Sequence, residues 1–151
     1  MTHPALAAFP VVIELDVGWS DMDSFDHVSN LVYFRYFQDA RVQYIERTGW
    51  LALKRDLGLG PILKSTGATY RKPLAFPDRV WIGVRAADVQ PDRVTFEHAV
   101  VSRAWDAVAC EGTAVVVSYD YRNACKCPLP DAVRKVIDEM EAHMKNEKPA
   151  G

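Results

Sequence analysis

The sequence predicts an α+β fold in which one long helix packs against an antiparallel sheet. A helical pattern rich in aromatic residues runs over about residues 29–48. A strand-like segment precedes it, and four more follow it, separated by turn signals. Strands joined by such turns pair as an antiparallel meander, so we expect a five-stranded antiparallel sheet. An amphipathic pattern over residues 131–145 predicts a C-terminal helix.

Length and composition indicate one globular domain. At 151 residues, we expect a single domain over residues 1–151, with its core between about 11 and 145. An apolar content of 49% and a charged content of 25% are ordinary for a soluble protein. The net charge of -2 gives no general reason to expect a nucleic-acid partner. No apolar run is long enough to span a bilayer, and the start lacks the basic residues of a signal peptide. We therefore expect a cytoplasmic protein without a membrane partner.

The cysteines agree with that location. Cys110, Cys125 and Cys127 are an odd number and lack the C-x-x-C spacing. We expect reduced thiols, as in a cytosolic protein. A metal or redox pair at Cys125 and Cys127 is disfavoured, because no further ligand cluster lies nearby in the sequence.

The first third of the chain is expected to hold a strand and the long helix. Residues 1–10 are expected to be a loose lead-in. Apolar residues then recur at every second position over residues 11–19, the period of a half-buried strand. Ser29 and Asn30 are both suitable N-cap residues for the long helix, because their side chains accept hydrogen bonds from a first helical turn. Gly49 is a plausible stop.

The helix is expected to bury a broad side against the sheet, because its apolar positions cover more than one face. Those positions are Val32, Tyr33, Tyr36, Phe37, Ala40, Tyr44 and Ile45. A short helix at 50–57 and strands at 62–71, 79–89, 94–104 and 108–119 are expected next. Residues 146–151 are expected to be disordered. A single helix leaves the other sheet face and the sheet edges uncovered, so we expect a homodimer or homotetramer.

The loop before the long helix gathers acidic side chains and a histidine. Asp21, Asp23, Asp26 and His27 come just ahead of Ser29. A helix N-terminus stabilises negative charge on an oxygen, because its N–H groups are unpaired. A carboxylate beside such an oxyanion site is the minimum equipment for attack on a carbonyl group.

The stretch WSDMDSFDHVSNLVYFRYFQDAR resembles the opening motif of the hotdog-fold acyl-CoA thioesterases of the 4-hydroxybenzoyl-CoA thioesterase type. That motif reads D-x-D-x-x-G-H-V-x-N-x-x-Y and continues into an aromatic-rich helix with an Ala-Arg pair. The matching residues are Asp21, Asp23, His27, Val28, Asn30, Tyr33, Ala40 and Arg41. The segments YRKPLAFPD and VTFEHAVVS and the Leu-Pro pair before the last helix fit too, so the resemblance covers about residues 11–140.

The resemblance implies a hotdog fold and hydrolysis of an acyl-coenzyme A to a carboxylic acid and coenzyme A. Asp23 matches the catalytic carboxylate, which acts as nucleophile or as base towards water. Asn30 matches the position whose backbone N–H polarises the thioester carbonyl. His27, which orients the substrate or Asp23, and Tyr33 line the same region. Coenzyme A is part of the substrate and lies along a dimer interface, and no cofactor or metal is expected.

Two more residues are candidates for substrate contacts. Asp26 stands where the motif usually has Gly, which places an extra carboxylate at the mouth of the site. Asp tolerates the left-handed backbone region better than most residues, so the turn itself can survive. Arg93 follows a turn at a place where family members bring basic groups to coenzyme A, although an ordinary surface charge is the alternative.

Plainer interpretations stay open. Asp23 can be a loop residue that caps its own turn, and His27 a structural histidine. A calcium loop is disfavoured, because the Gly and Glu that it needs are Asp26 and Val32 here. For the whole protein the alternatives are a non-catalytic hotdog module that binds acyl-CoA or a partner protein, and a hotdog hydratase or dehydratase.

Overall fold

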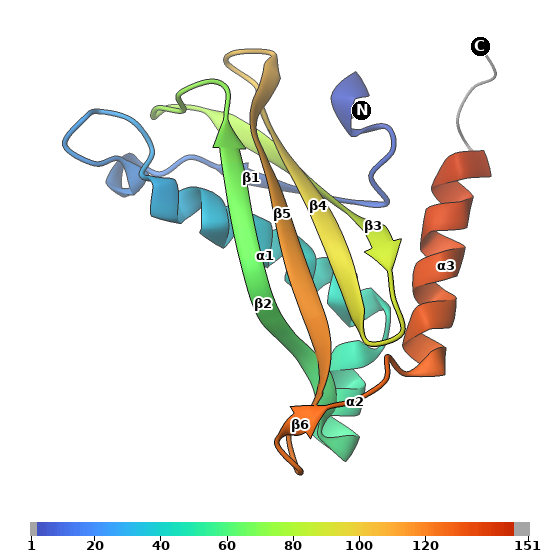
Figure 1. Ribbon diagram of the computed structural model, residues 1–151. Coiled ribbons are helices and arrows are strands. Elements are labelled where there is room, and N and C mark those ends of the chain that lie inside the picture. The colour runs from blue at the N-terminus through green and yellow to red at the C-terminus, as the bar shows by residue number, and fades with distance from the viewer. Residues whose placement is uncertain (1–2, 147–151) are drawn as a thin grey trace.

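The computed structural model describes residues 3–146 and consists of a curled antiparallel sheet wrapped around one long helix (Figure 1). The strands are β1 (Val11–Asp16), β2 (Leu59–Tyr70), β3 (Arg79–Val89), β4 (Arg93–Ser102), β5 (Ala107–Asp120) and β6 (Cys125–Lys126). The helices are α1 (Asn30–Arg47), α2 (Trp50–Leu57) and α3 (Asp131–Asn146), with short 3-10 helices η1 (Pro4–Leu6) and η2 (Trp19–Asp21). The α+β class, the long central helix and the closing helix are confirmed, and this is the hotdog arrangement that the resemblance implies.

The strand order corrects two details of the predicted sheet. The order is β1-β3-β4-β5-β2, and all paired neighbours are antiparallel. Strands β3, β4 and β5 form the expected meander, but β2 pairs with β5 instead of β3, because β1 already occupies that edge of β3. A sixth strand, β6, pairs with the end of β5. A strand of two residues is too short to show an alternating pattern in the sequence, so the predicted number of five strands was one too low.

Helix α1 begins and ends close to the predicted residues. Ser29 is its N-cap, with Oγ accepting from the Leu31 N–H at 3.4 Å, and Asn30 is the first helical residue rather than the cap. Gly49 follows the helix with φ 82°, a left-handed conformation that suits glycine. The buried side chains of α1 are Tyr33, Tyr36, Phe37, Ala40, Arg41, Tyr44 and Ile45. Arg41 was not among the residues expected to be buried. Val32 was among them, but it is only half-buried.

The N-terminal segment is ordered from His3 onward, so the expected loose lead-in is wrong for residues 3–10. Leu6 and Phe9 are buried on the outer face of the sheet, where they pack with Ala99 and Val101. Gly83 makes room for them, because a Cβ there would lie 2.8 Å from a Leu6 methyl carbon. The expected disorder of the C-terminal tail concerns residues 147–151, which lie outside the described residues, whereas Asn146 ends α3.

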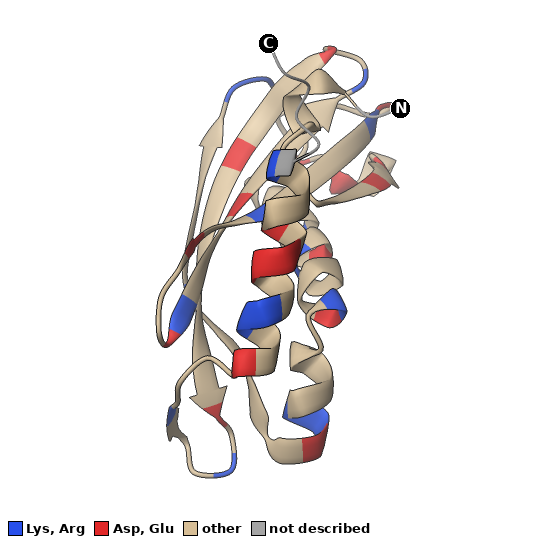
Figure 2. Cartoon of the chain, turned by 90° about the vertical axis from the view of Figure 1, so that its right-hand side faces the viewer, with Lys and Arg blue, Asp and Glu red and all other residues tan. Residues whose placement is uncertain are grey.

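Helix α3 lies beside β3 and ties it to α1 (Figure 1). Glu141 Oε1 accepts from the Tyr44 hydroxyl of α1 and from the Ala86 N–H of β3, both at 2.8 Å. The outward face of α3 carries acidic and basic side chains in alternation (Figure 2), as expected for the solvent-facing side of an amphipathic helix. Val133 and Ile137, on its other face, are fully buried.

The core between α1 and the sheet contains one histidine. His98 of β4 is 2% exposed, and its ring lies 5.0 Å from the Phe37 ring, measured between centroids. Neither ring nitrogen has a hydrogen-bond partner among the described residues. Burial lowers the pKa of His98 to about 3, and repulsion by the nearby Arg41 guanidinium adds to the shift. His98 is therefore neutral in the folded protein at neutral pH.

We predict that His98 makes the fold sensitive to acid. The unfolded histidine takes up a proton near pH 6.5, whereas the folded one resists protonation down to about pH 3. The stabilising contribution is present above pH 6.5 and is lost as pH falls, by about 1.4 kcal/mol per pH unit. His98→Gln should flatten this slope, as measured by urea unfolding between pH 7 and pH 4. Identical slopes in both proteins would contradict the assignment.

Candidate active site

The acidic loop is fixed to the end of the sheet by backbone hydrogen bonds. The Val28 N–H donates to the Leu74 carbonyl at 2.8 Å, and this bond joins the loop to the segment after β2. Met22 and Val28 form an isolated antiparallel bridge that closes the loop on itself. These bonds fix the direction in which the chain enters the first turn of α1.

Asp21 has a structural role. Its Oδ2 accepts from the Gly18 N–H at 2.8 Å, and its Oδ1 accepts from Arg35 Nη2 at 3.0 Å. Its carbonyl accepts from the Ser29 N–H at 2.9 Å. The Asp21 side chain is only 11% exposed. With one hydrogen bond to each carboxylate oxygen, Asp21 joins the loop to α1.

Asp23 caps its own turn with one oxygen. Its Oδ1 accepts from the Phe25 N–H at 2.9 Å, its N–H donates to the His27 carbonyl at 3.0 Å, and its carbonyl accepts from the Asp26 N–H at 3.1 Å. The side chain is exposed. Within residues 3–146, Oδ2 accepts no hydrogen bond, so the turn orients the carboxylate and leaves one oxygen accessible.

The usual glycine turn survives with aspartate in its place. Asp26 has φ 61°, the left-handed conformation that the motif's glycine would adopt easily. Its side chain is exposed and does not line the hollow described next.

A hollow of about 340 Å³ opens where the loop meets α1 and the end of β2. Its lining consists of His27, Val28, Asn30, Tyr33, Tyr70, Arg71, Lys72 and Pro73. Tyr33 and Tyr70 meet edge to face with ring centroids 5.1 Å apart, and the Tyr33 oxygen accepts from the Leu74 N–H at 3.3 Å. Burial raises the pKa of the Tyr33 hydroxyl, so it stays protonated at neutral pH.

The structure therefore brings together most, but not all, of the predicted site residues. His27, Asn30 and Tyr33 line one hollow, and Asp23 lies in the same loop, hydrogen-bonded to His27 through the backbone. The residues from 70 to 73 were not among the predicted site residues. Their signal was the pair of basic residues and the proline directly after a strand.

Arg93 lies far from this hollow within one chain. It begins β4, whereas the hollow lies at the end of the sheet where β4 finishes, about 30 Å away at the rise of an extended strand. The guanidinium is held by its neighbour Asp92, with Nε 2.8 Å from Oδ1 and Nη2 3.0 Å from Oδ2. Only a second copy of the chain can place Arg93 beside the hollow.

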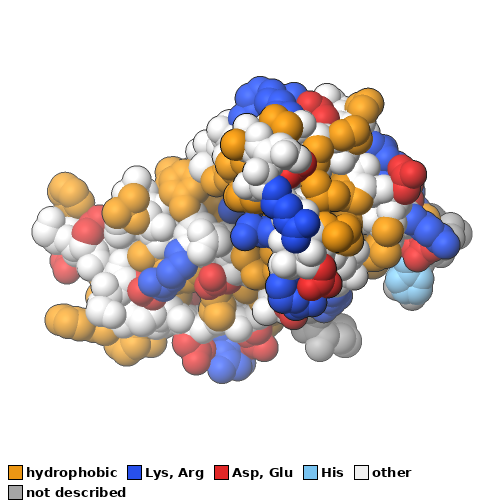
Figure 3. Space-filling view, turned by 90° about the horizontal axis from the view of Figure 1, so that it is seen from below, with side chains coloured by type: hydrophobic (Ala, Val, Ile, Leu, Met, Phe, Trp, Pro, Cys, Tyr) orange, Lys and Arg blue, Asp and Glu red, His pale blue; other side chains and the backbone are white. Residues whose placement is uncertain are grey.

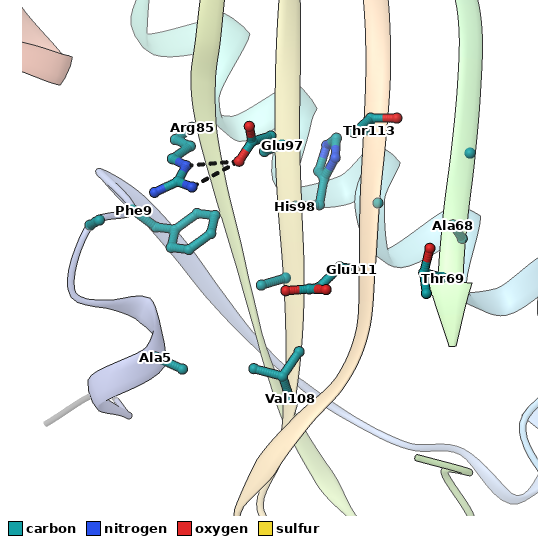
Figure 4. A pocket seen from close by; sticks show the side chains of 14 residues that line it. Ala5, Phe9, Ala68, Thr69, Arg85, Glu97, His98, Val108, Glu111 and Thr113 are labelled. Atoms are coloured by element: carbon teal, nitrogen blue, oxygen red, sulfur yellow. Dashed lines mark hydrogen bonds and ion pairs between the residues drawn. The ribbon is translucent and has the colours of Figure 1, made fainter. Parts of the chain in front are cut away.

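A second hollow, of about 740 Å³ and thus larger than the first, lies on the outer face of the sheet and contains none of the predicted site residues (Figure 4). Its charged side chains already neutralise one another. Arg85 Nη2 lies 2.8 Å from Glu97 Oε2, and Glu111 accepts from Arg71 at its rim. Size alone therefore does not mark the site.

Several exposed apolar side chains come from the segments that border the smaller hollow. Trp19, Phe25, Leu31 and Phe76 are all exposed and come from the loop before α1, the first turn of α1 and the loop after β2. Figure 3 shows hydrophobic side chains at the same end of the molecule, on the left of that view.

Cys110, Cys125 and Cys127 are free thiols. Within residues 3–146, no three His, Cys, Asp or Glu side chains gather closely enough to hold a metal ion. None of the described helices combines the length and the apolar character needed to cross a bilayer.

Comparison with known proteins identifies similar chains. The sequence model of a family described as the thioesterase-like superfamily matches residues 17–137. A protein of Aquifex aeolicus (strain VF5), provisionally named an esterase, is 32% identical over 92 residues, which are 60% of this chain and 72% of that relative.

Solved structures agree with this match. A thioesterase from Thermus thermophilus, crystallised with coenzyme A and Zn, superposes with a TM-score of 0.79 at 28% identity, over 89% of this chain and 96% of that one. The DHNA-CoA thioesterase of Staphylococcus aureus shares the fold, with a TM-score of 0.78 at 14% identity, over 93% of this chain and 96% of that one.

We predict that Asp26→Gly stabilises the protein by about 0.5 kcal/mol, because glycine adopts a positive φ without strain. Ala124, which also has a positive φ of 54° in the turn between β5 and β6, is the matched control. Ala124→Gly should stabilise for the same reason. Urea unfolding measures both variants. A loss of stability confined to Asp26→Gly would mean that the Asp26 side chain itself supports the turn.

Proposed function

Because the chain belongs to the thioesterase-like superfamily, we propose that it is an acyl-CoA thioesterase, which hydrolyses an acyl-coenzyme A to a carboxylic acid and coenzyme A. One observation carries this proposal: the hollow at Asn30, the N-terminus of α1, adjoins the loop that presents Asp23. The coenzyme A bound to the similar thioesterase of Thermus thermophilus supports the choice of ligand.

Asn30 supplies the electrophilic side of the reaction. It is the first residue of an 18-residue helix, so its N–H has no partner within the helix and carries the positive end of the helix dipole. A thioester carbonyl placed against this N–H becomes more electrophilic, and the negative charge that develops on its oxygen is stabilised.

Asp23 supplies the attacking side. As a general base, its free Oδ2 takes a proton from water while the water oxygen attacks the carbonyl carbon. The tetrahedral intermediate then expels the coenzyme A thiolate, which the same proton neutralises. As a nucleophile, the carboxylate forms a mixed anhydride that water opens to the same products. Either route needs little acid help, because a thiol pKa is only about 8.5.

His27 and Tyr33 position these groups. The His27 carbonyl accepts from the Asp23 N–H, which fixes the turn, and the residue also lines the hollow. Tyr33 is buried and anchors the Leu74 segment, so it forms a rigid wall for the acyl group. A fixed carboxylate and a fixed wall reduce the entropy lost when the thioester reaches a reactive orientation.

We also propose a homodimer, or a tetramer of dimers, that shares its sites across an interface. Strand β2 has 12 residues but pairs only on its β5 side, and Ile62 and Leu63 on it are 38% and 47% exposed. If two copies pair through this edge about a two-fold axis, their β2 strands run antiparallel to each other. This pairing would bring the end of the sheet that carries Arg93 close to the hollow of the other copy, as substrate binding by Arg93 requires.

We expect Asp23→Asn to lower turnover by a factor of about 100 or more, as for loss of a nucleophile or general base. The assay is release of free thiol from acyl-CoAs that differ in chain length and aromaticity. Asp138→Asn, which removes an exposed carboxylate from α3, is the control and should keep its activity. Near-normal rates in the folded Asp23→Asn protein would refute the assignment. Tight binding of acyl-CoA without any thiol release would favour the non-catalytic module.

The proposed interface is tested by light scattering at micromolar concentration, where we expect the mass of two or four chains. Leu63→Asp should shift the protein towards monomers, because it places a charge on the edge strand. Val42→Asp, at a similarly exposed position of α1, should not. A monomeric wild-type protein would rule out the proposal.

A further inference from the structure

Two cationic residues, Arg71 and Lys72, are among those that line the hollow, and only Arg71 is paired with an acid. The Arg71 guanidinium lies 2.6 Å from Glu111 Oε2 through Nη2 and 2.7 Å through Nε. The Lys72 ammonium instead rests over the Trp105 ring, with Nζ 5.0 Å from the ring centroid. Among the described residues, no carboxylate forms an ion pair with Lys72.

Hydrogen bonds hold the backbone of Lys72 and the aromatic ring beneath its ammonium group. The Lys72 N–H donates to the Ala109 carbonyl at 3.1 Å, which fixes its backbone against β5. The indole of Trp105 donates to the Pro73 carbonyl at 2.7 Å, and the Trp105 N–H donates to Ser102 Oγ at 3.0 Å. The ring on which the ammonium rests is therefore fixed to the residue next to Lys72. An ordered lysine loses less side-chain entropy on binding than a free one.

The same hollow has a second positive element and apolar walls. The N-terminus of α1 reaches it at Asn30, and the aromatic rings of Tyr33 and Tyr70 form its sides. The helix dipole adds roughly half a positive charge there. Such a lining suits a ligand with an apolar body and a negatively charged oxygen.

We propose that Lys72 is the anion-binding residue of this site and holds a negatively charged oxygen of the substrate. The inference rests on the proposed function. Two parts of an acyl-CoA can offer such an oxygen: the phosphates of coenzyme A, or a carboxylate at the end of a dicarboxylic acyl group. Both make the same charge-assisted contact with an ammonium group, so the experiment must separate the two sources.

The test compares four thioesters by thiol release. Pentanoyl and glutaryl groups have the same number of carbons, but only glutaryl ends in a carboxylate. Each is attached either to coenzyme A or to N-acetylcysteamine, which has the same thiol end without the phosphates. The variants are Lys72→Met, Lys72→Arg and, as a matched control on α3, Lys135→Met.

If Lys72 holds a phosphate, Lys72→Met lowers kcat/KM about tenfold on both coenzyme A thioesters, chiefly through KM, and leaves both N-acetylcysteamine thioesters unchanged. If Lys72 holds a carboxylate, Lys72→Met lowers kcat/KM on the two glutaryl thioesters instead. Lys72→Arg should keep most of the activity, because the charge is retained. Equal changes on all four substrates, or an equal loss in Lys135→Met, would overturn the proposal.

Calorimetric binding of coenzyme A alone and of glutarate alone separates this inference from the proposed function. Lys72→Met should weaken one of the two by about tenfold even if no thioester is hydrolysed. Unchanged affinity for both would refute the role of Lys72. Asp23→Asn should lose turnover on all four thioesters but keep these affinities, so failure of the catalytic assignment is recognised independently.

Discussion

The contact between Phe37 and Gly112 determines how closely α1 packs against the sheet, and the site depends on that packing. A Cβ at position 112 would overlap the Phe37 ring, so only glycine lets the helix lie at this depth. The ring also packs against His98 on the neighbouring strand. Asn30 lies about two turns before Phe37 on the same rigid helix. The position of the proposed oxyanion donor is therefore fixed by the core as well as by the hydrogen bonds of the loop before it.

Two ionisable side chains are buried beside Phe37 on the same helix and on the neighbouring strand. Arg41 lies one turn after Phe37 and is 8% exposed, and burial lowers the pKa of its guanidinium. His98, close to it, stays neutral because of burial and of the Arg41 charge. A buried cation and an unpaired imidazole each destabilise a fold unless packing compensates. Large apolar side chains pack in the same core, among them Tyr44 and Phe96, whose rings meet edge to face with centroids 5.1 Å apart.

Local patterns predicted the elements well and their pairing less well. The bounds of α2 and β3 agree with the predicted residues, and those of α1 differ by one at each end, because periodicity and caps are local signals. The pairing of β2 with β5 was not predicted, because it depends on contacts between residues that are far apart in the sequence. The ordered N-terminal segment was missed for the same reason, since Leu6 needs the space left by Gly83. In the site, the motif predicted the residues of the loop and of α1 that line the hollow. Lys72 also lines the hollow, because the hydrogen bond between Val28 and Leu74 joins two segments that are far apart in the sequence, and no local pattern predicts such a bond.

The turn role and the proposed chemical role of Asp23 do not compete. A carboxylate that attacks or deprotonates must keep one oxygen free while its orientation is held, because reactive geometry tolerates little error. The Phe25 N–H holds Oδ1, and no described group holds Oδ2. Asp21 differs, because each of its oxygens accepts a hydrogen bond and its side chain is only 11% exposed. Of the two acids, only Asp23 combines a fixed orientation with an accessible oxygen, so its self-capping turn is a reason to assign it the chemistry.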